Sequence, residues 1–217
     1  RDKYVISIGD IDFTRVFRSE STLDVFISGI INSVYSADNR DEWLCMKNLL
    51  ATYKNAEGGC GYFDYEVTDM AKATSKEAFA KDMVKAVRKA VIDVSFLSTS
   101  FNVAGVETWS EVSDLVLLVN KDVLVEVDVE LLAKAFHQSN TDMKVVPTII
   151  AMDDFGTLAD TYALMVDKNW FRVYDTLFHM ETQRNADGLF TNHFLHHHQI
   201  LSASTFKNAV RFKKVSA

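Results

Sequence analysis

The strongest pattern of hydrophobic and polar positions lies in residues 21–53. Apolar side chains recur there every three or four positions, which places them on one face of a helix. They continue on both sides of a polar break at residues 37–41: Leu23, Phe26, Ile27, Ile30, Ile31, Val34 and Tyr35 precede it, and Trp43, Met46, Leu50 and Tyr53 follow it. The spacing predicts one long helix, or two helices nearly in line with a kink near Asn39.

Polar residues at both ends of this stretch fit a helix of that length. Ser19, Ser21 and Thr22 offer hydroxyl groups that can accept hydrogen bonds from the first free backbone N–H groups. Asn55 and the glycines at 58–59 are typical of a helix stop. A mean globular helix has about 11–12 residues, so we expect this one to organise the domain around it.

Shorter patterns predict the remaining elements. Period-two alternation or continuous apolar runs predict strands at residues 4–8, 62–67, 115–119, 145–152, 162–166 and 170–174. Two further strands, 177–182 and 189–201, are predicted to form a hairpin around the turn residues 184–188. Residues 10–17 fit either a helix or a strand, and residues 121–136 fit a mixed segment that ends in an amphipathic helix. Residues 205–212 close the chain.

A second helix is predicted at residues 75–96, with Ser75 as its N-cap. Its buried stripe would consist of Phe79, Met83, Val87, Ala90, Val91 and Val94. Its other faces carry Lys76, Lys81, Lys85, Arg88 and Lys89. Because Glu77, Asp82 and Asp93 interleave with these cations, we interpret them as a solvated face and not as a nucleic-acid surface.

Composition excludes several kinds of protein. The formal charge of −7 argues against tight nucleic-acid binding, which needs clustered cations. The one loose basic cluster, Lys207, Arg211, Lys213 and Lys214, is interpreted as a solvated strand edge. No run of about 18 apolar residues suggests a membrane span. Cys45 and Cys60 are too few for a disulfide framework.

Histidines on one predicted strand are the first candidate for chemistry. His196 and His198 would share one face of the strand, and His193 and His197 the other. A pair two positions apart can bind zinc or iron, with His179 of the preceding strand as the nearest further ligand. No spaced carboxylate or cysteine partner is evident, so packing in an amphipathic strand is the favoured interpretation.

The acidic pair Asp153 and Asp154, at the end of a predicted strand, is the second candidate. Paired carboxylates in such a place can hold a metal ion for phosphoryl transfer. No downstream lysine or acidic motif completes that constellation, and a role in the turn at the strand end is favoured. The chain has no P-loop, nucleophile elbow or dinucleotide fingerprint, so the residues alone identify no active site.

Four stretches, in order, resemble segments of tailed-bacteriophage major capsid proteins: residues 26–50, 114–136, 163–181 and 182–212. The second reads DLVLLVNKDVLVEVDVELLAKAF and the third ALMVDKNWFRVYDTLFHME. The first resembles the spine helix of that family, and the fourth its closing hairpin and final strand. The likeness is greatest to the short-tailed phi-29-type phages, whose shell proteins have the Hong Kong 97 type fold.

This resemblance implies an α+β phage capsid shell fold with a long spine helix. Residues 1–70 and 176–204 would form the peripheral subdomain with the spine helix and the hairpin. Residues 71–175 and 205–217 would form the axial subdomain. The histidine strand would lie where relatives place bulky residues, which also favours packing over metal binding.

The function implied by the resemblance is structural: a subunit of an icosahedral phage head that encloses packaged DNA, without catalytic, metal-binding or cofactor-binding residues. Expected partners are other copies of the chain, in hexamers and pentamers, together with scaffolding and portal proteins. Specific nucleic-acid binding and membrane attachment are not expected. The expected location is the virion, after assembly in the cytoplasm of the host bacterium.

Two alternatives remain open. One is the shell protein of an encapsulin-like nanocompartment, which would enclose cargo protein in place of DNA. The other is a metal-dependent hydrolase that uses Asp153, Asp154 and the histidines.

Relatives also carry an N-terminal arm and an extended loop ahead of the spine helix, and almost nothing precedes Ser19 here. We therefore expect this form to be monomeric or to assemble poorly.

Overall fold

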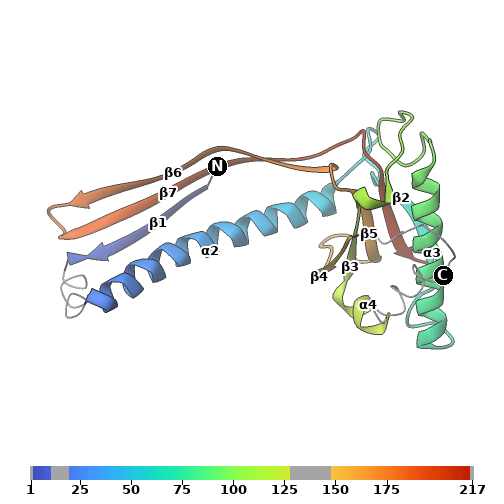
Figure 1. The fold of residues 1–217 in the computed structure, drawn as a ribbon, viewed down its shortest axis with the longest axis horizontal. Helices are drawn as coiled ribbons and strands as arrows, with labels where there is room; N and C mark the ends of the chain where they lie inside the picture. The colour runs from blue at the N-terminus through green and yellow to red at the C-terminus, as the bar shows by residue number, and fades with distance from the viewer. Residues whose placement is uncertain (1, 11–19, 128–147, 216–217) are drawn as a thin grey trace. The chain divides into compact units, whose positions relative to one another are not determined.

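The computed structural model describes residues 2–10, 20–127 and 148–215 (Figure 1). The chain divides into two compact units, Arg1–Met46 with Val173–Leu201, and Lys47–Arg172 with Ser202–Ala217. The sequence-based division placed its boundaries at 70/71, 175/176 and 204/205, and its peripheral and axial subdomains stay a prediction. Within the described ranges, no helix is long and apolar enough to cross a membrane.

The long helix is α2, Glu20–Thr52, and its 33 residues run without interruption. The alternative of two helices with a kink near Asn39 is therefore wrong. The polar break contains neither proline nor glycine, the residues at which sharp kinks usually occur. The predicted stop is confirmed: the Asn55 side chain accepts hydrogen bonds from the backbone N–H of Glu57 and Gly59, and Gly58 adopts a φ of 81°. The predicted N-cap at Ser19 lies outside the described residues, as do residues 11–17.

The first unit contains a three-stranded sheet beside α2. Its order is β1-β7-β6, with β1 at Asp2–Gly9, β6 at Phe171–Asn185 and β7 at Phe190–Ala203. β1 runs antiparallel to β7, from the pair Asp2 and His197 to the pair Gly9 and Phe190. The predicted hairpin is confirmed, and the Asn185 side chain binds the backbone N–H groups of Asp187 and Gly188 in its turn. The separate strands predicted at 170–174 and 177–182 are one continuous strand, β6.

The second unit contains a mixed five-stranded sheet of order β2-β8-β5-β3-β4. The strands are β2 (Phe63–Val67), β3 (Leu115–Asn120), β4 (Thr148–Met152), β5 (Thr161–Asp167) and β8 (Ala209–Lys214). β2 is parallel to β8 and β3 is parallel to β4, whereas β5 is antiparallel to both of its neighbours. The 3₁₀ turn η1 (Val112–Asp114) precedes β3, and the short helix α4 (Lys121–Glu126) follows it. Residues 128–136, where an amphipathic helix was predicted, are outside the described ranges.

Helix α3, Lys76–Ser95, confirms the second predicted helix. The hydroxyl oxygen of Ser75 accepts a hydrogen bond from the backbone N–H of Ala78, as an N-cap should. Every residue of the predicted stripe is buried: Phe79, Met83, Val87, Ala90, Val91 and Val94. The stripe packs on one face of the five-stranded sheet, against residues such as Leu117, Met165 and Phe212.

The opposite face of this sheet is covered as well. Leu118 and Leu164, which alternate with the residues that face α3, join a cluster around the fully buried Trp170. Tyr53 meets the Trp170 ring edge-on with centroids 4.9 Å apart, and Tyr62 lies 6.1 Å from it. Two covered faces explain why β3 and β5 are continuous apolar runs.

The basic cluster near the C-terminus is not a solvated strand edge, so that prediction was wrong. β8 lies between β2 and β5, inside the sheet. Arg211 is buried, and its Nε and Nη2 atoms each lie 2.7 Å from an oxygen of Asp64. Sequence spacing marked a cationic strand but did not determine which strands would flank it.

Candidate assembly surface

The histidine candidates do not converge on one site. His197 is buried on β7, with its Nδ1 2.7 Å from Asp38 Oδ2 and its Nε2 3.3 Å from Asp175 Oδ1. His179, on β6, lies 3.5 Å from a carboxylate oxygen of Glu181 instead. In the ranges described, no group of three or more His, Cys, Asp or Glu residues could hold a metal ion. Among the histidines that the structure describes, the most buried one, His197, thus lies in a network of carboxylates.

Asp38 was missed by the sequence interpretation, which assigned it to a polar break. It lies four positions after the buried Val34 and is itself buried, at 5% exposure. A helix places residues four apart on the same face, so Asp38 continues the inward face of α2. A lone acidic residue at the spacing of an apolar stripe was the available signal.

Asp153 and Asp154 lie just after β4 and share one cation. The Nζ of Lys47, near the end of α2, is 2.8 Å from an oxygen of each carboxylate. Hydrogen bonding to Lys47 holds the pKa of both carboxyl groups below its usual range and raises the pKa of Lys47. Asp154 also accepts a hydrogen bond from the backbone N–H of Gly156 in the following turn. The acidic pair therefore fastens a strand end to a helix end, and its charges are balanced by Lys47.

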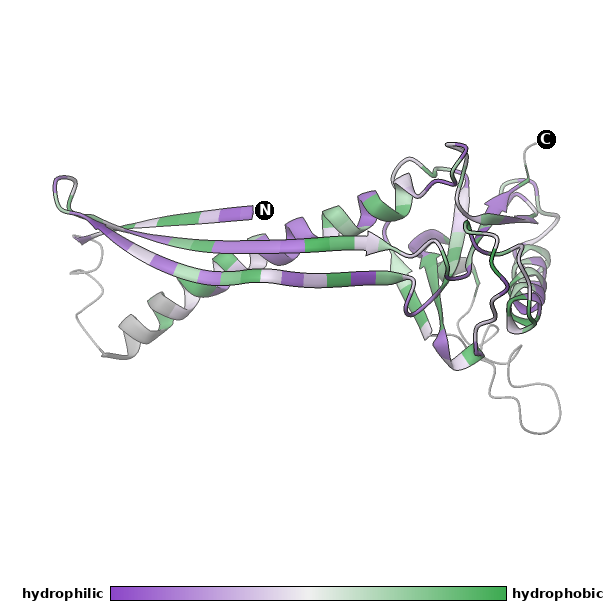
Figure 2. Ribbon diagram, turned by 90° about the horizontal axis from the view of Figure 1, so that it is seen from above, coloured by the Kyte–Doolittle hydropathy of each residue, from purple (hydrophilic) through white to green (hydrophobic). Residues whose placement is uncertain are grey.

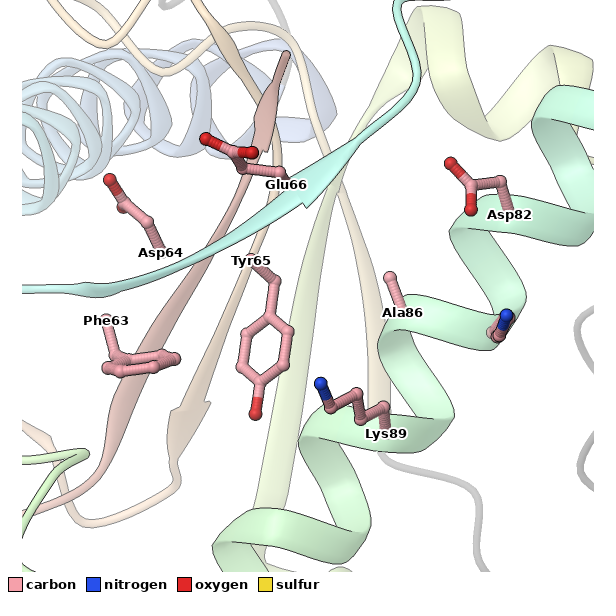
Figure 3. A pocket seen from close by; sticks show the side chains of 8 residues that line it. Phe63, Asp64, Tyr65, Glu66, Asp82, Ala86 and Lys89 are labelled. Carbon is pink, nitrogen blue, oxygen red and sulfur yellow. The ribbon is translucent and has the colours of Figure 1, made fainter.

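A hollow of about 500 Å³ lies between β2 and α3 in the second unit (Figure 3). Tyr65 points from β2 towards Lys89 of α3, whose ammonium is 5.8 Å from the ring centroid. The acidic side chains at the hollow already have partners: Asp64 binds Arg211, and Asp82 binds the backbone N–H and hydroxyl of Thr68. Burial and the hydrogen bond to Asp93 raise the pKa of the Tyr65 phenol, so this hydroxyl stays protonated at neutral pH. These contacts hold α3 on the sheet and do not present a reactive group.

Strand β6 is the most conspicuous open surface. It stands at the edge of its sheet, with β7 as its one neighbour among the described strands. Every residue from 172 to 185 is exposed, and apolar and polar residues interleave along the strand (Figure 2). We call its five large exposed apolar side chains the β6 apolar surface: Val173, Tyr174, Leu177, Phe178 and Met180.

The β6 apolar surface combines two features that favour association. An edge strand offers unpaired backbone donors and acceptors to another chain, and its exposed apolar side chains add apolar contact area on both faces. Within β6 there is no proline to block pairing. Part of the surface is already braced from within the unit, because the Phe178 ring stacks on Tyr35 of α2 with centroids 5.9 Å apart. This geometry can hold another protein chain.

Comparisons with known proteins identify phage major capsid proteins as relatives of this chain. The profile of the Phi29-like phage major capsid protein family matches residues 1–213. The chain is 36% identical over 211 residues to the major capsid protein of Bacillus phage PZA, and 34% identical over 211 residues to that of Bacillus phage B103. Each match covers 96% of this chain and 45% of the relative, so the chain spans less than half the length of these relatives.

A solved structure supports the fold. The capsid structure of Staphylococcus phage Andhra matches with a TM-score of 0.69 at 15% identity, over 99% of this chain and 70% of that chain. At such low identity the likeness concerns the fold alone. It confirms the predicted α+β capsid shell fold.

Proposed function

The chain belongs to the Phi29-like phage major capsid protein family, and we propose that it serves as a structural subunit of an icosahedral bacteriophage head that encloses packaged DNA. Its contribution would be repeated contact with other copies of itself, with no catalysed reaction. The resemblance noted in the sequence is confirmed at the level of the family. The role of the whole protein is our inference from that membership and from the surface described above.

The observation that carries this proposal is the β6 apolar surface. Val173 and Leu177 lie on one face of the strand, and Tyr174, Phe178 and Met180 on the other, so both faces offer apolar contacts. Charged residues of both signs lie on the same strand: Asp175 between these apolar residues, Arg172 before them, and Glu181 and Arg184 after them. A strand with apolar groups and both charges can pair with a second copy in a repeating contact, which is how shells with closed symmetry are built.

We infer the finer organisation from the family resemblance. The unit with α2, β1, β6 and β7 would be the peripheral part of the subunit, and the five-stranded unit the axial part. Self-association would give hexamers and pentamers, with scaffolding and portal proteins as further partners. The mature location would be the virion, after assembly in the cytoplasm of the host bacterium. A charge of −7 supports enclosure of DNA through shell geometry in place of strong DNA contacts.

The two alternatives have less support. A metal-dependent hydrolase would need Asp153 and Asp154 to face a metal ion, yet both carboxylates bind Lys47. An encapsulin-like compartment would share the fold, but the matching family is one of phage capsid proteins. Neighbouring terminase and portal genes would separate a phage head from a compartment.

The test is electron microscopy of the full protein, expressed with and without its candidate scaffolding partner. We expect closed shells or curved sheets from the wild type. Leu177→Lys places a charge in the β6 apolar surface and should prevent them. Gln183→Lys is the matched control, because it adds the same charge to the same exposed face of β6 six positions away.

Two results would contradict the proposal. One is a wild-type protein that is uniformly monomeric and metal-loaded under every condition, which would favour the metal-dependent hydrolase instead. The other is normal assembly of Leu177→Lys. This result would contradict the β6 apolar surface as the assembly contact, although the family membership would stand. Circular dichroism of both variants verifies that the substituted chains fold.

A further inference from the structure

His197 occupies a position between three elements of the first unit. Its ring projects from β7 and meets Asp38 of α2 through Nδ1, at 2.8 and 2.7 Å from the two carboxylate oxygens. Its Nε2 meets Asp175 of β6 at 3.3 Å, and the Phe178 ring packs edge-on against it. His197 is 6% exposed and Asp38 5% exposed. One imidazole therefore links the helix and two strands.

The two contacts show in which protonation state both ring nitrogens of His197 are hydrogen-bonded. A neutral imidazole has one N–H donor and one lone pair, whereas an ionised carboxylate only accepts. Both ring nitrogens of His197 face carboxylates, so both contacts are hydrogen bonds only in the imidazolium. The cation also balances the buried charge of Asp38, which would otherwise be costly.

The surrounding charges favour the same state. Burial by itself would lower the pKa of His197, but its hydrogen bonds to Asp38 and Asp175 and their charges outweigh burial and raise it. Asp2 of β1 is paired with His197 of β7 in the sheet. Asp41 of α2 accepts a hydrogen bond from the hydroxyl of Tyr4, also on β1. Other titratable groups on the elements packed around His197 are Lys3 and Tyr4 of β1, Glu42 of α2, His179 of β6, and His193, His196 and His198 of β7.

We propose that His197 is a pH-dependent clamp that holds the edge strand β6 to β7 and α2 and that loosens β6 around Asp175 when the ring loses a proton. The proton leaves Nε2 for solvent. The remaining N–H stays at Nδ1, because Asp38 is buried and closer, whereas the Asp175 side chain is 58% exposed and can be hydrated. The lone pair on Nε2 then faces the Asp175 carboxylate and repels it.

The direction of the pH effect follows from the raised pKa. Stabilisation by the clamp is complete below the pKa of an unfolded histidine, about 6.5, and is lost as pH rises through the higher folded value. The clamp acts within a single chain, so it holds or fails independently of the proposed assembly role. Loss of the clamp would loosen β6, the strand with the exposed apolar residues.

The test is amide hydrogen exchange of the whole chain between pH 6 and 9, with each rate divided by the intrinsic rate at the same pH. We expect protection of residues 173–177 to fall roughly three- to tenfold across this range in the wild type, as for one charge-assisted hydrogen bond with an exposed partner. Asp175→Asn removes the carboxylate that Nε2 faces and leaves no buried charge unpaired. Its protection should be independent of pH.

Glu181→Gln is the matched control, since it removes another exposed carboxylate from β6, the one next to His179. It should retain the wild-type pH dependence. A histidine side-chain NMR titration should show a lower pKa for His197 in Asp175→Asn than in wild type. Protection that is constant with pH in the wild type, or an equal slope in Asp175→Asn, would overturn the clamp.

Discussion

Arg211 and Asp64 form a two-point ion pair inside the five-stranded sheet, with Nε and Nη2 of the arginine each 2.7 Å from a carboxylate oxygen. The pair joins neighbouring strands, because Asp64 of β2 and Arg211 of β8 are in register. Burial would raise the pKa of Asp64, but hydrogen bonding to Arg211 outweighs it and lowers that pKa. A planar guanidinium provides both parallel hydrogen bonds, which a lysine cannot reproduce.

We therefore predict that Arg211→Lys lowers the free energy of unfolding by about 2 kcal/mol, because one hydrogen bond to a partly buried carboxylate is lost. Urea unfolding monitored by circular dichroism measures this as a lower midpoint at unchanged slope. Lys214→Arg, on the same strand but 45% exposed, is the control and should stay within about 0.5 kcal/mol of wild type. Equal midpoints for both variants would mean that the pair has no net stabilising effect.

Trp170 is the largest fully buried side chain and the centre of the aromatic cluster below the sheet. Its backbone carbonyl accepts a hydrogen bond from Ser204, and the Tyr53 hydroxyl donates to the carbonyl of Ser204. Trp170→Ala should lower the free energy of unfolding by about 3–5 kcal/mol, because it removes buried area and leaves a cavity.

The control for this change is Trp109→Ala, since Trp109 is 51% exposed. It should change the free energy of unfolding by less than about 0.5–1 kcal/mol. Thermal unfolding of both variants, followed by tryptophan fluorescence and circular dichroism, makes the comparison. Similar losses in the two would show that the aromatic cluster is not a core of the second unit.

Lys47 gives a prediction about acid stability. The pKa values of Asp153 and Asp154 are lowered by Lys47, so their contribution is present above the unfolded value of about 3.9 and is lost as pH falls through the lower folded values. Lys47→Met removes the cation and should flatten the dependence of the melting temperature on pH below about 5. Lys72→Met, at an exposed lysine of the same unit, should keep the wild-type curve.

Because both aspartates are largely exposed, the effect of Lys47→Met should also shrink at high salt. Melting curves at low and high ionic strength test this second feature. A wild-type curve that is already flat in acid would contradict the assigned role of Lys47.

Local chemistry made much of the fold predictable. The extent of α2, the buried stripe of α3 with its Ser75 cap, and the turn at Asn185 all depend on residues close together in the chain. Periodicity and capping report such short-range relations directly. The resemblance to phage capsid proteins also came from the residues alone, because it rests on ordered stretches of sequence.

The tertiary structure decided which polar residues meet. Asp38 and His197 are 159 positions apart, and Lys47 and Asp153 are 106 apart. The position of β8 inside the sheet, which buries Arg211, depends on strand order, and a strand pattern is the same whichever neighbours it acquires. Sequence by itself therefore determined the elements and the family of this protein. Only long-range packing determined the His197 network, the Lys47 contacts and the open edge of β6, because these arise from pairings that no local spacing encodes.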